Sequence, residues 1–250
     1  MTLFGKKIPV LFSLVIWFIL WELVGRAKFS LIVPPFSSVV AAGITILPSE
    51  KFAMAASISL RSFALGMAFA VVIGIPLGVL MARVESLGKI LGMWVNIFIS
   101  APISALVPIL MSVVGIGETT VVVTVFLFAV FVIILDTQVG VQQADKSLVE
   151  MALAFGASRS QLYGKVLLLS ALPEILAGLR LGAIRGVKGV VIGQLLIAIL
   201  GVGELFELYS RNFLMEEFWA LVVVVFAFAF AVSEAIAFVE RRVEYYASAR

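Results

Sequence analysis

Apolar residues fall into six runs along this chain, each long enough to cross a bilayer as a helix of roughly 20 residues. Most charged residues lie in the segments between the runs, and no internal repeat or low-complexity tract is evident. The pattern predicts an all-α membrane protein, with residues 1–250 forming one domain. Its six predicted transmembrane helices are Ile8–Val24, Ser57–Ala82, Ile90–Val114, Thr120–Gly140, Pro173–Leu200 and Phe218–Val239.

The composition agrees with a chain whose solvent is mostly lipid, because 63% of the residues are hydrophobic and only 13% are charged. The sequence contains no His and no Cys. It therefore cannot build an imidazole or thiolate metal site, a Ser/His or Cys/His nucleophile, or a disulfide. The net charge is +3, but the basic residues are dispersed around hydrophobic segments, which favours membrane topology over nucleic-acid binding.

The distribution of Lys and Arg over the connections predicts the orientation, since these residues collect on the cytoplasmic side. With the N-terminus inside, ten fall on the inner side and five on the outer side, which favours both termini in the cytoplasm. The inner ten are Lys6, Lys7, Arg83, Lys89, Lys146, Arg159, Lys165, Arg241, Arg242 and Arg250; the outer five are Arg26, Lys28, Lys51, Arg61 and Arg211. The first run is expected to be an uncleaved anchor, although a signal peptide is the alternative.

A polar segment, Ser147–Lys165, separates the fourth and fifth predicted spans on the inner side. Ser147 and Glu150 have the S-x-x-E spacing of a capping box, and Ser158 and Gln161 repeat it as S-x-x-Q. Gly156 falls between the two, where a chain leaving a helix often needs a positive φ. We therefore expect a helix, a tight turn and a second helix presented to water, and call this segment the polar hairpin.

Glycine and proline mark the third and fifth predicted spans as candidates for lining a pathway. Gly178, Gly182 and Gly186 recur every four residues in the fifth, which predicts an interior helix in close contact with its neighbours. Pro102 and Pro108 predict a kinked or partly unwound third span, and broken backbone at membrane depth is tolerated inside protein or beside a wet cavity. The alternative is that both residue types are simply frequent in membrane helices.

Two cations lie deep in the fifth predicted span: Arg185 and Lys188 are about 12 and 15 residues from its start, where a cation costs about 2.5–3.5 kcal/mol on insertion scales. Their spacing places them on one face, which Gln194 does not share closely. Either they line a cavity that attracts an anion, or they pair with a buried acid. The candidate pathway residues are Pro102, Pro108, Arg185, Lys188 and Gln194; the candidate acids are Asp136, Glu174 and Glu234.

The polar hairpin resembles the EAA loop of membrane subunits of binding-protein-dependent ABC importers. The resemblance rests on Glu150, Met151 and Ala152, followed by Gly156 and an apolar stretch that ends at Leu172-Pro173. Further runs are similar to the permeases for nitrate, taurine and aliphatic sulfonates, and the resemblance extends from about Trp17 to Arg242. These runs are Gly156–Arg159, Ala171–Arg180, Val114–Glu118 and Val33–Pro35.

The sequence departs from this family pattern at several positions. Met151 replaces an alanine, and Lys188 and Gln194 are not the residues expected at their positions. Leu169 stands where many relatives have a further proline, which predicts a straighter entry into the fifth span. The changes at Lys188 and Gln194 concern the substrate, and the change at Leu169 concerns the local geometry. None of them argues against an ABC importer permease.

The resemblance implies a type I ABC importer permease fold in the bacterial inner membrane, within which residues 141–172 form a cytoplasmic coupling loop. In this family the loop inserts a short helix into an ATPase subunit. The matching coupling residues are Glu150, Ala152, Leu153, Phe155, Gly156, Ala157 and Ser158. The sequence has no phosphate-binding G-x-x-x-x-G-K-[ST] motif, so this chain is expected to hold no cofactor, and ATP and Mg are expected in separate subunits.

The implied assembly is a permease homodimer with two ATPase subunits and an extracytoplasmic solute-binding protein, importing a small anion such as a sulfonate, nitrate or carboxylate. The outer stretches Ala27–Ala56 and Gly201–Glu204 could receive the binding protein. The main alternative is a secondary transporter or channel that needs no ATPase. An intramembrane enzyme is a third possibility, but Asp136 and the scattered Glu residues do not form a catalytic constellation.

Overall fold

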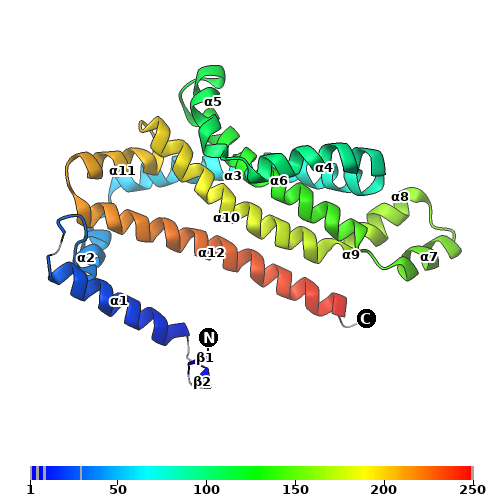
Figure 1. Cartoon of the computed structure of the whole chain (residues 1–250), viewed down its shortest axis with the longest axis horizontal. Coiled ribbons are helices and arrows are strands. Elements are labelled where there is room, and N and C mark those ends of the chain that lie inside the picture. Colours follow the sequence, from blue (N-terminus) through cyan, green and yellow to red (C-terminus); the bar gives the residue numbers. More distant parts are fainter. Residues whose placement is uncertain (1, 4–5, 8–9, 29, 249–250) are drawn as a thin grey trace.

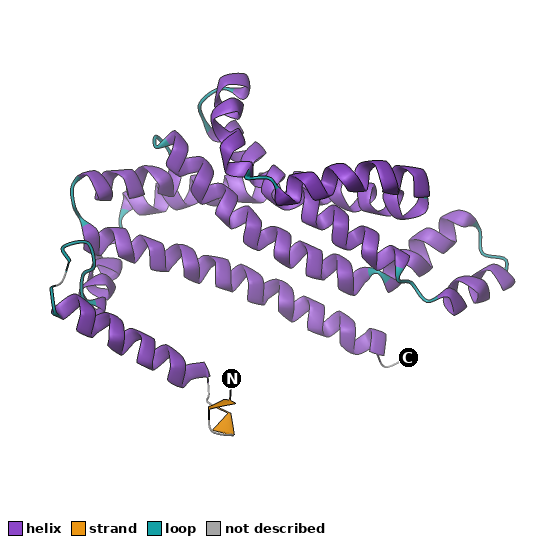
Figure 2. Ribbon diagram, in the orientation of Figure 1, coloured by secondary structure: helices purple, strands orange, loops and turns teal. Residues whose placement is uncertain are grey.

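The computed structural model describes residues 2–3, 6–7, 10–28 and 30–248, and nearly all of these lie in helices (Figures 1 and 2). A two-residue antiparallel pair, β1 (Thr2–Leu3) with β2 (Lys6–Lys7), precedes them. A helix or a pair of helices occupies each predicted span, but α3 begins seven residues earlier than predicted and α12 ends nine residues later. Ile8 lies outside the described residues. In chain order these helices are α1 (Val10–Arg26), α3 (Glu50–Arg83), α4 (Glu85–Ser100) with η1 (Ile103–Leu106) and α5 (Val107–Val114), α6 (Glu118–Gln142), α10 (Leu172–Ile197) and α12 (Met215–Ser248).

Three of the described helices, α3, α6 and α12, are each long and apolar enough to cross a membrane. Two further spans are bent: α4 meets η1 and α5 at 90°, and α10 meets the helix before it at 61°. The described residues therefore supply up to five spans by this criterion. α1 has 17 described residues, which is at the lower limit of the length that spans a bilayer.

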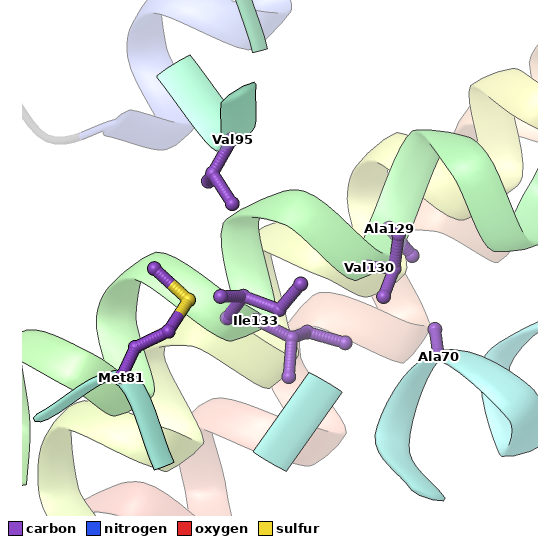
Figure 3. Close-up of a cluster of buried hydrophobic side chains, with 7 residues drawn as sticks. Ala70, Met81, Val95, Ala129, Val130 and Ile133 are labelled. Atoms are coloured by element: carbon purple, nitrogen blue, oxygen red, sulfur yellow. The ribbon is translucent and has the colours of Figure 1, made fainter. Parts of the chain in front are cut away.

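Helix α6 lies between α3 and α10, and glycines on those two helices allow the close approach. A Cβ added at Gly74 of α3 or at Gly182 of α10 would lie 2.9 Å from Ile133 of α6. Ile133 is fully buried, and Figure 3 shows it among side chains of α3, α4 and α6. The predicted close packing of the glycine-rich fifth span is therefore confirmed, but α6 is the helix that its neighbours enclose.

The α3–α6 contact gives a direct test of this packing. At Gly78 a Cβ would lie 2.6 Å from the carbonyl oxygen of Ile134 and 2.7 Å from Cβ of Thr137, so Gly78→Ala forces two backbones apart. We expect it to cost about 1–3 kcal/mol, as overpacking does, and to lower the melting temperature of the purified protein in detergent. At Gly92 the nearest atom is Cε of Met81, 4.0 Å away, so Gly92→Ala is the matched control. An unchanged melting temperature for Gly78→Ala would contradict the close contact.

The two ends of the molecule differ in character. Short helices α2 (Phe36–Ile46) and α11 (Gly201–Arg211), neither of which the sequence predicted, lie at one end of the long axis, and the polar hairpin lies at the other (Figure 1). Near α2, the indole N–H groups of Trp21 and Trp219 donate to the carbonyls of Pro34 (3.1 Å) and Ile32 (2.8 Å). Tryptophans with a bonded polar edge are typical of a membrane–water interface, so this end of the molecule has the character of such an interface.

Candidate functional site

The polar hairpin has the predicted form of a helix, a tight turn and a second helix. Helix α7 (Lys146–Ala154) ends at Phe155, and Gly156 follows with φ +77°. The Ala157 N–H donates to the Ala152 carbonyl at 3.0 Å and the Gly156 N–H donates to the Leu153 carbonyl at 2.9 Å, which together make a Schellman C-cap. The role predicted for Gly156 in the turn is confirmed, because a side chain is strained at this φ.

Of the two predicted capping boxes, the second is confirmed and the first is wrong. The Gln161 N–H donates to Ser158 Oγ at 3.3 Å, and the Ser158 N–H donates to Gln161 Oε1 at 2.9 Å. Helix α7, however, begins at Lys146, and the Asp145 carboxylate caps it by accepting from the Ser147 N–H at 2.8 Å. Ser147 therefore lies inside the first turn. The carboxylate of Glu150 makes no bond within the described chain and is exposed to solvent.

After Ser158 the chain forms α8 (Arg159–Gln161), a single π-helical segment η2 (Leu162–Leu167) and α9 (Leu168–Ser170). It then turns by 61° into α10. The entry into α10 is thus clearly bent; the prediction that Leu169 makes it straighter than in relatives stays a prediction. Pro173 alone can break the helix here, because its ring clashes with the carbonyl four residues earlier and it restricts the residue before it.

The tip of the hairpin carries large apolar side chains that nothing in the described chain covers. Phe155 is 86% exposed, Leu153 53% and Met151 52%. Ala154 and Gly156 are also exposed, whereas Ala152 and Ala157 are half-buried. An exposed apolar patch of this kind is typical of a surface that binds another protein or a membrane, since burial of its apolar area would stabilise the complex. We call Met151, Leu153, Phe155 and Gly156 the tip face.

The predicted break in the third span is present. Helix α4 ends at Ser100, the extended residues Ala101 and Pro102 follow, and η1 and α5 continue at 90°. Pro108 occupies the first turn of α5, where its missing N–H costs nothing. Both prolines are exposed on the single chain. Their place in a pathway stays a prediction.

The two deep cations of α10 do not pair with any of the three candidate acids. Arg185 is half-buried and Lys188 is exposed, and no acidic oxygen within the described chain lies within 4.0 Å of either cationic group. Glu234 instead pairs with Arg241 (3.6 Å). The pairing interpretation is therefore not supported at contact distance, although Arg185 lies within electrostatic range of Asp136.

Lys188 lies on the one face of α10 that no other described helix covers. Leu181, Lys188 and Leu195 are exposed at intervals of seven residues, which is one stripe along a helix. The glycines that contact α6 lie on a different face, and Arg180, which reaches Glu240 of α12 at 2.9 Å, marks a third. We call Leu181, Lys188 and Leu195 the free stripe; Arg185 lies at its border with the α6 face.

Gln194 is away from the free stripe, in the contact between α3, α10 and α11. It is fully buried, its Oε1 accepts from Ser59 Oγ at 2.9 Å, and the Gly203 N–H approaches the same oxygen at 3.4 Å. Ser59 Oγ in turn accepts from the Val202 N–H at 3.0 Å. Ser59 was not among the predicted site residues. The available signal was the Gly201-x-Gly203 spacing after the span, because neither glycine leaves room for a Cβ beside Gln194.

The sequence is similar to those of characterised transport proteins. It is 28% identical over 217 residues, which cover 85% of this chain and 79% of the relative, to the taurine transport system permease protein TauC of Escherichia coli strain K12. It is 32% identical over 147 residues to the glycine betaine/carnitine/choline permease protein OpuCD of Bacillus subtilis strain 168, covering 59% of this chain and 62% of that one. This second match thus spans less than two thirds of that relative.

The fold is shared with solved ABC transporters. An inward-facing structure of the MetNI methionine ABC transporter matches with a TM-score of 0.64 and 23% identity, covering 74% of this chain and 93% of that chain. An amino acid ABC transporter crystallised with histidines matches with a TM-score of 0.62 and 14% identity, covering 95% and 100%. Residues 74–245, well over half of the sequence, match the model of the family described as "Binding-protein-dependent transport system inner membrane component". The chain therefore belongs to this family of ABC importer membrane permeases.

Proposed function

We propose that this permease works as one of two identical subunits of an ATP-driven importer, and that the substrate is a small anion. The observation that carries the proposal is the exposure of Lys188, which has no acidic partner on the described chain. A cation at this depth costs about 2.5–3.5 kcal/mol if it faces lipid. A second subunit and a water-filled pathway would remove that cost.

A second copy is favoured by the form of the free stripe. Leu181 and Leu195 flank Lys188 and offer apolar contact area, and a two-fold axis beside α10 would bring the same stripe of both copies together. The pathway would then lie between the copies, with Arg185, Lys188, Pro102 and Pro108 from each. Gln194 would act indirectly, by holding α10 against α3 and α11 through its bond to Ser59.

The charge of this pathway supports an anion as the substrate class. Two subunits would supply two copies each of Arg185 and Lys188, and like charges along a low-dielectric channel raise the local concentration of the opposite ion. Relatives named for glycine betaine, carnitine and choline make a quaternary ammonium the rival substrate. Such cations are usually held by aromatic side chains, and the free stripe and Arg185 contain none. Sulfonates, taurine among them, are the first compounds to test.

The two ends of the molecule would meet different partners. The tip face suits insertion into a cytoplasmic ATPase, with the exposed carboxylate of Glu150 available to a basic residue of that subunit. Helices α2 and α11 at the opposite end would receive the solute-binding protein outside the cell. This arrangement places both termini in the cytoplasm of a bacterium, as the Lys and Arg distribution predicts.

Affinity purification from the native membrane tests this assembly. We expect the tagged permease to bring down a second, untagged copy and two ATPase subunits, and native mass spectrometry should give a two-to-two ratio. A secondary transporter or a channel would instead purify without an ATPase. That result, or a strictly monomeric permease, would contradict the proposed importer.

A further inference from the structure

One contact ties the polar hairpin to helix α3. The guanidinium carbon of Arg83, the last residue of α3, lies 4.6 Å from the centre of the Tyr163 ring in η2. This is a cation–π geometry. Tyr163 sits in a π-helical segment, a local distortion that is frequent at functional sites, and this segment leads into the 61° bend before α10.

The packing below this contact is incomplete. At the hairpin root, Leu168 packs with Ile75 and Val79 of α3 around the buried Ala171 and Ile175. An open groove of about 350 Å³ lies beside it, lined by Ile75, Pro76, Val79, Leu80, Arg83, Tyr163 and Leu168. Because nothing in the described chain fills this groove, the hairpin has room to move relative to α3. The Arg83–Tyr163 contact spans the edge of that groove.

The α3–α4 corner beyond Arg83 is tightly closed. Val84 alone separates the two helices, and a Cβ at Gly88 would lie 2.6 Å from the Met81 carbonyl oxygen. A displacement of Arg83 must therefore carry the first turn of α4 with it. Helix α4 then runs to the break at Ala101 and Pro102, where the chain turns by 90°. A continuous path thus joins Tyr163 to the proposed pathway.

We propose that Arg83 and Tyr163 are positioning residues that transmit movement of the polar hairpin, through the α3–α4 corner, to the break at Pro102. The inference rests on the proposed function, because it assumes that an ATPase moves the hairpin. Neither residue touches substrate. A single cation–π pair at a protein surface stabilises a fold only weakly, so variants that lack it should still fold and assemble.

Because the permease sequence contains no cysteine, a single introduced cysteine can be labelled specifically in this chain. Ala105, exposed in η1 just beyond the break, is replaced by cysteine, and the complex with its copurified ATPase is placed in lipid nanodiscs. The labelling rate by a membrane-impermeant methanethiosulfonate is measured without nucleotide and after trapping with ATP and vanadate. We expect trapping to change the rate about fivefold in the Ala105→Cys parent, as a shift between two conformations does. Tyr163→Leu should abolish this change while ATP hydrolysis continues.

Two further variants distinguish a role of Arg83 and Tyr163 in transmitting movement from a role in stabilising the fold. Tyr163→Phe retains the aromatic face and should retain the nucleotide-dependent change in labelling. Arg83→Ala combined with Tyr163→Leu should be no worse than either single variant, because the two residues form one unit. A full response in Tyr163→Leu would overturn the inference and leave the importer intact. Absence of a copurified ATPase would overturn the proposed function. If nucleotide does not change the labelling rate of the Ala105→Cys parent, movement of the hairpin is not transmitted to the break at Pro102, and the inference is also overturned.

Discussion

Phe155→Ala should remove most of the ATPase from the purified complex while the permease itself remains folded. Phe155 is 86% exposed on the single chain, so its truncation leaves no cavity. Buried aromatic anchors at interface centres typically contribute at least about 2 kcal/mol, which corresponds to a roughly 30-fold weaker complex. The measurement is the ratio of ATPase to permease after affinity purification, together with the melting temperature of the permease.

A matched control comes from the exposed surface of α12. Phe226 of α12 is 69% exposed, and its replacement by alanine removes the same side chain from a helix that is long and apolar enough to span the membrane. We expect Phe226→Ala to leave the ATPase ratio unchanged. If Phe155→Ala and Phe226→Ala behave alike, the tip face is not the ATPase-binding surface, and the exposed apolar residues there need another partner.

Signals that act within a few residues were readable from the sequence. The Ser158–Gln161 capping box and the turn at Gly156 form as predicted, because the first depends on two side chains three residues apart and the second on one backbone angle. The spans were readable for a similar reason, since the length of an apolar run is what lipid selects. Even the break at Pro102 follows from proline's missing N–H and fixed φ.

Where two similar local signals lie close together, the sequence did not show which one the structure uses. Asp145 and Ser147 are both good helix caps two residues apart, and the structure uses Asp145. The enclosed position of α6 depends on glycines that belong to its neighbours, such as Gly74 and Gly182, so the hydrophobicity of α6 itself does not reveal it. Helices α2 and α11 escaped prediction because they are too short to register as spans.

Contacts between segments far apart in the sequence were also not predicted. The partner of a buried polar group is fixed by the packing of whole helices, so Ser59 could not be assigned to Gln194 across 135 residues of sequence. Likewise, the candidate acids for Arg185 and Lys188 were selected only because they lie within predicted spans. In the structure, Glu234 forms its ion pair with Arg241 instead. That Lys188 has no acidic partner within the described part of the chain became apparent only from the structure.

Lys188→Ala should reduce anion uptake by roughly 10- to 100-fold without changing assembly. The estimate follows from the loss of a charge-assisted hydrogen bond to the substrate, which is worth about 1.5–3 kcal/mol. The measurement is uptake of radiolabelled taurine, a longer alkanesulfonate or nitrate into proteoliposomes that contain the whole complex and its binding protein. Lys188→Arg keeps the charge and should keep most of the rate.

The same substitution distinguishes a pathway cation from one that lies against lipid. If Lys188 faced lipid, its removal would relieve about 2.5–3.5 kcal/mol of insertion cost, so the yield of inserted permease would rise while uptake per molecule stayed constant. If it lines the pathway, yield stays constant and uptake falls. Arg242→Ala, which removes an exposed cation from the C-terminal part of α12, controls for net charge and should change neither quantity. A choline rate that rises in Lys188→Ala as the anion rate falls would place Lys188 at the point where substrate charge is selected.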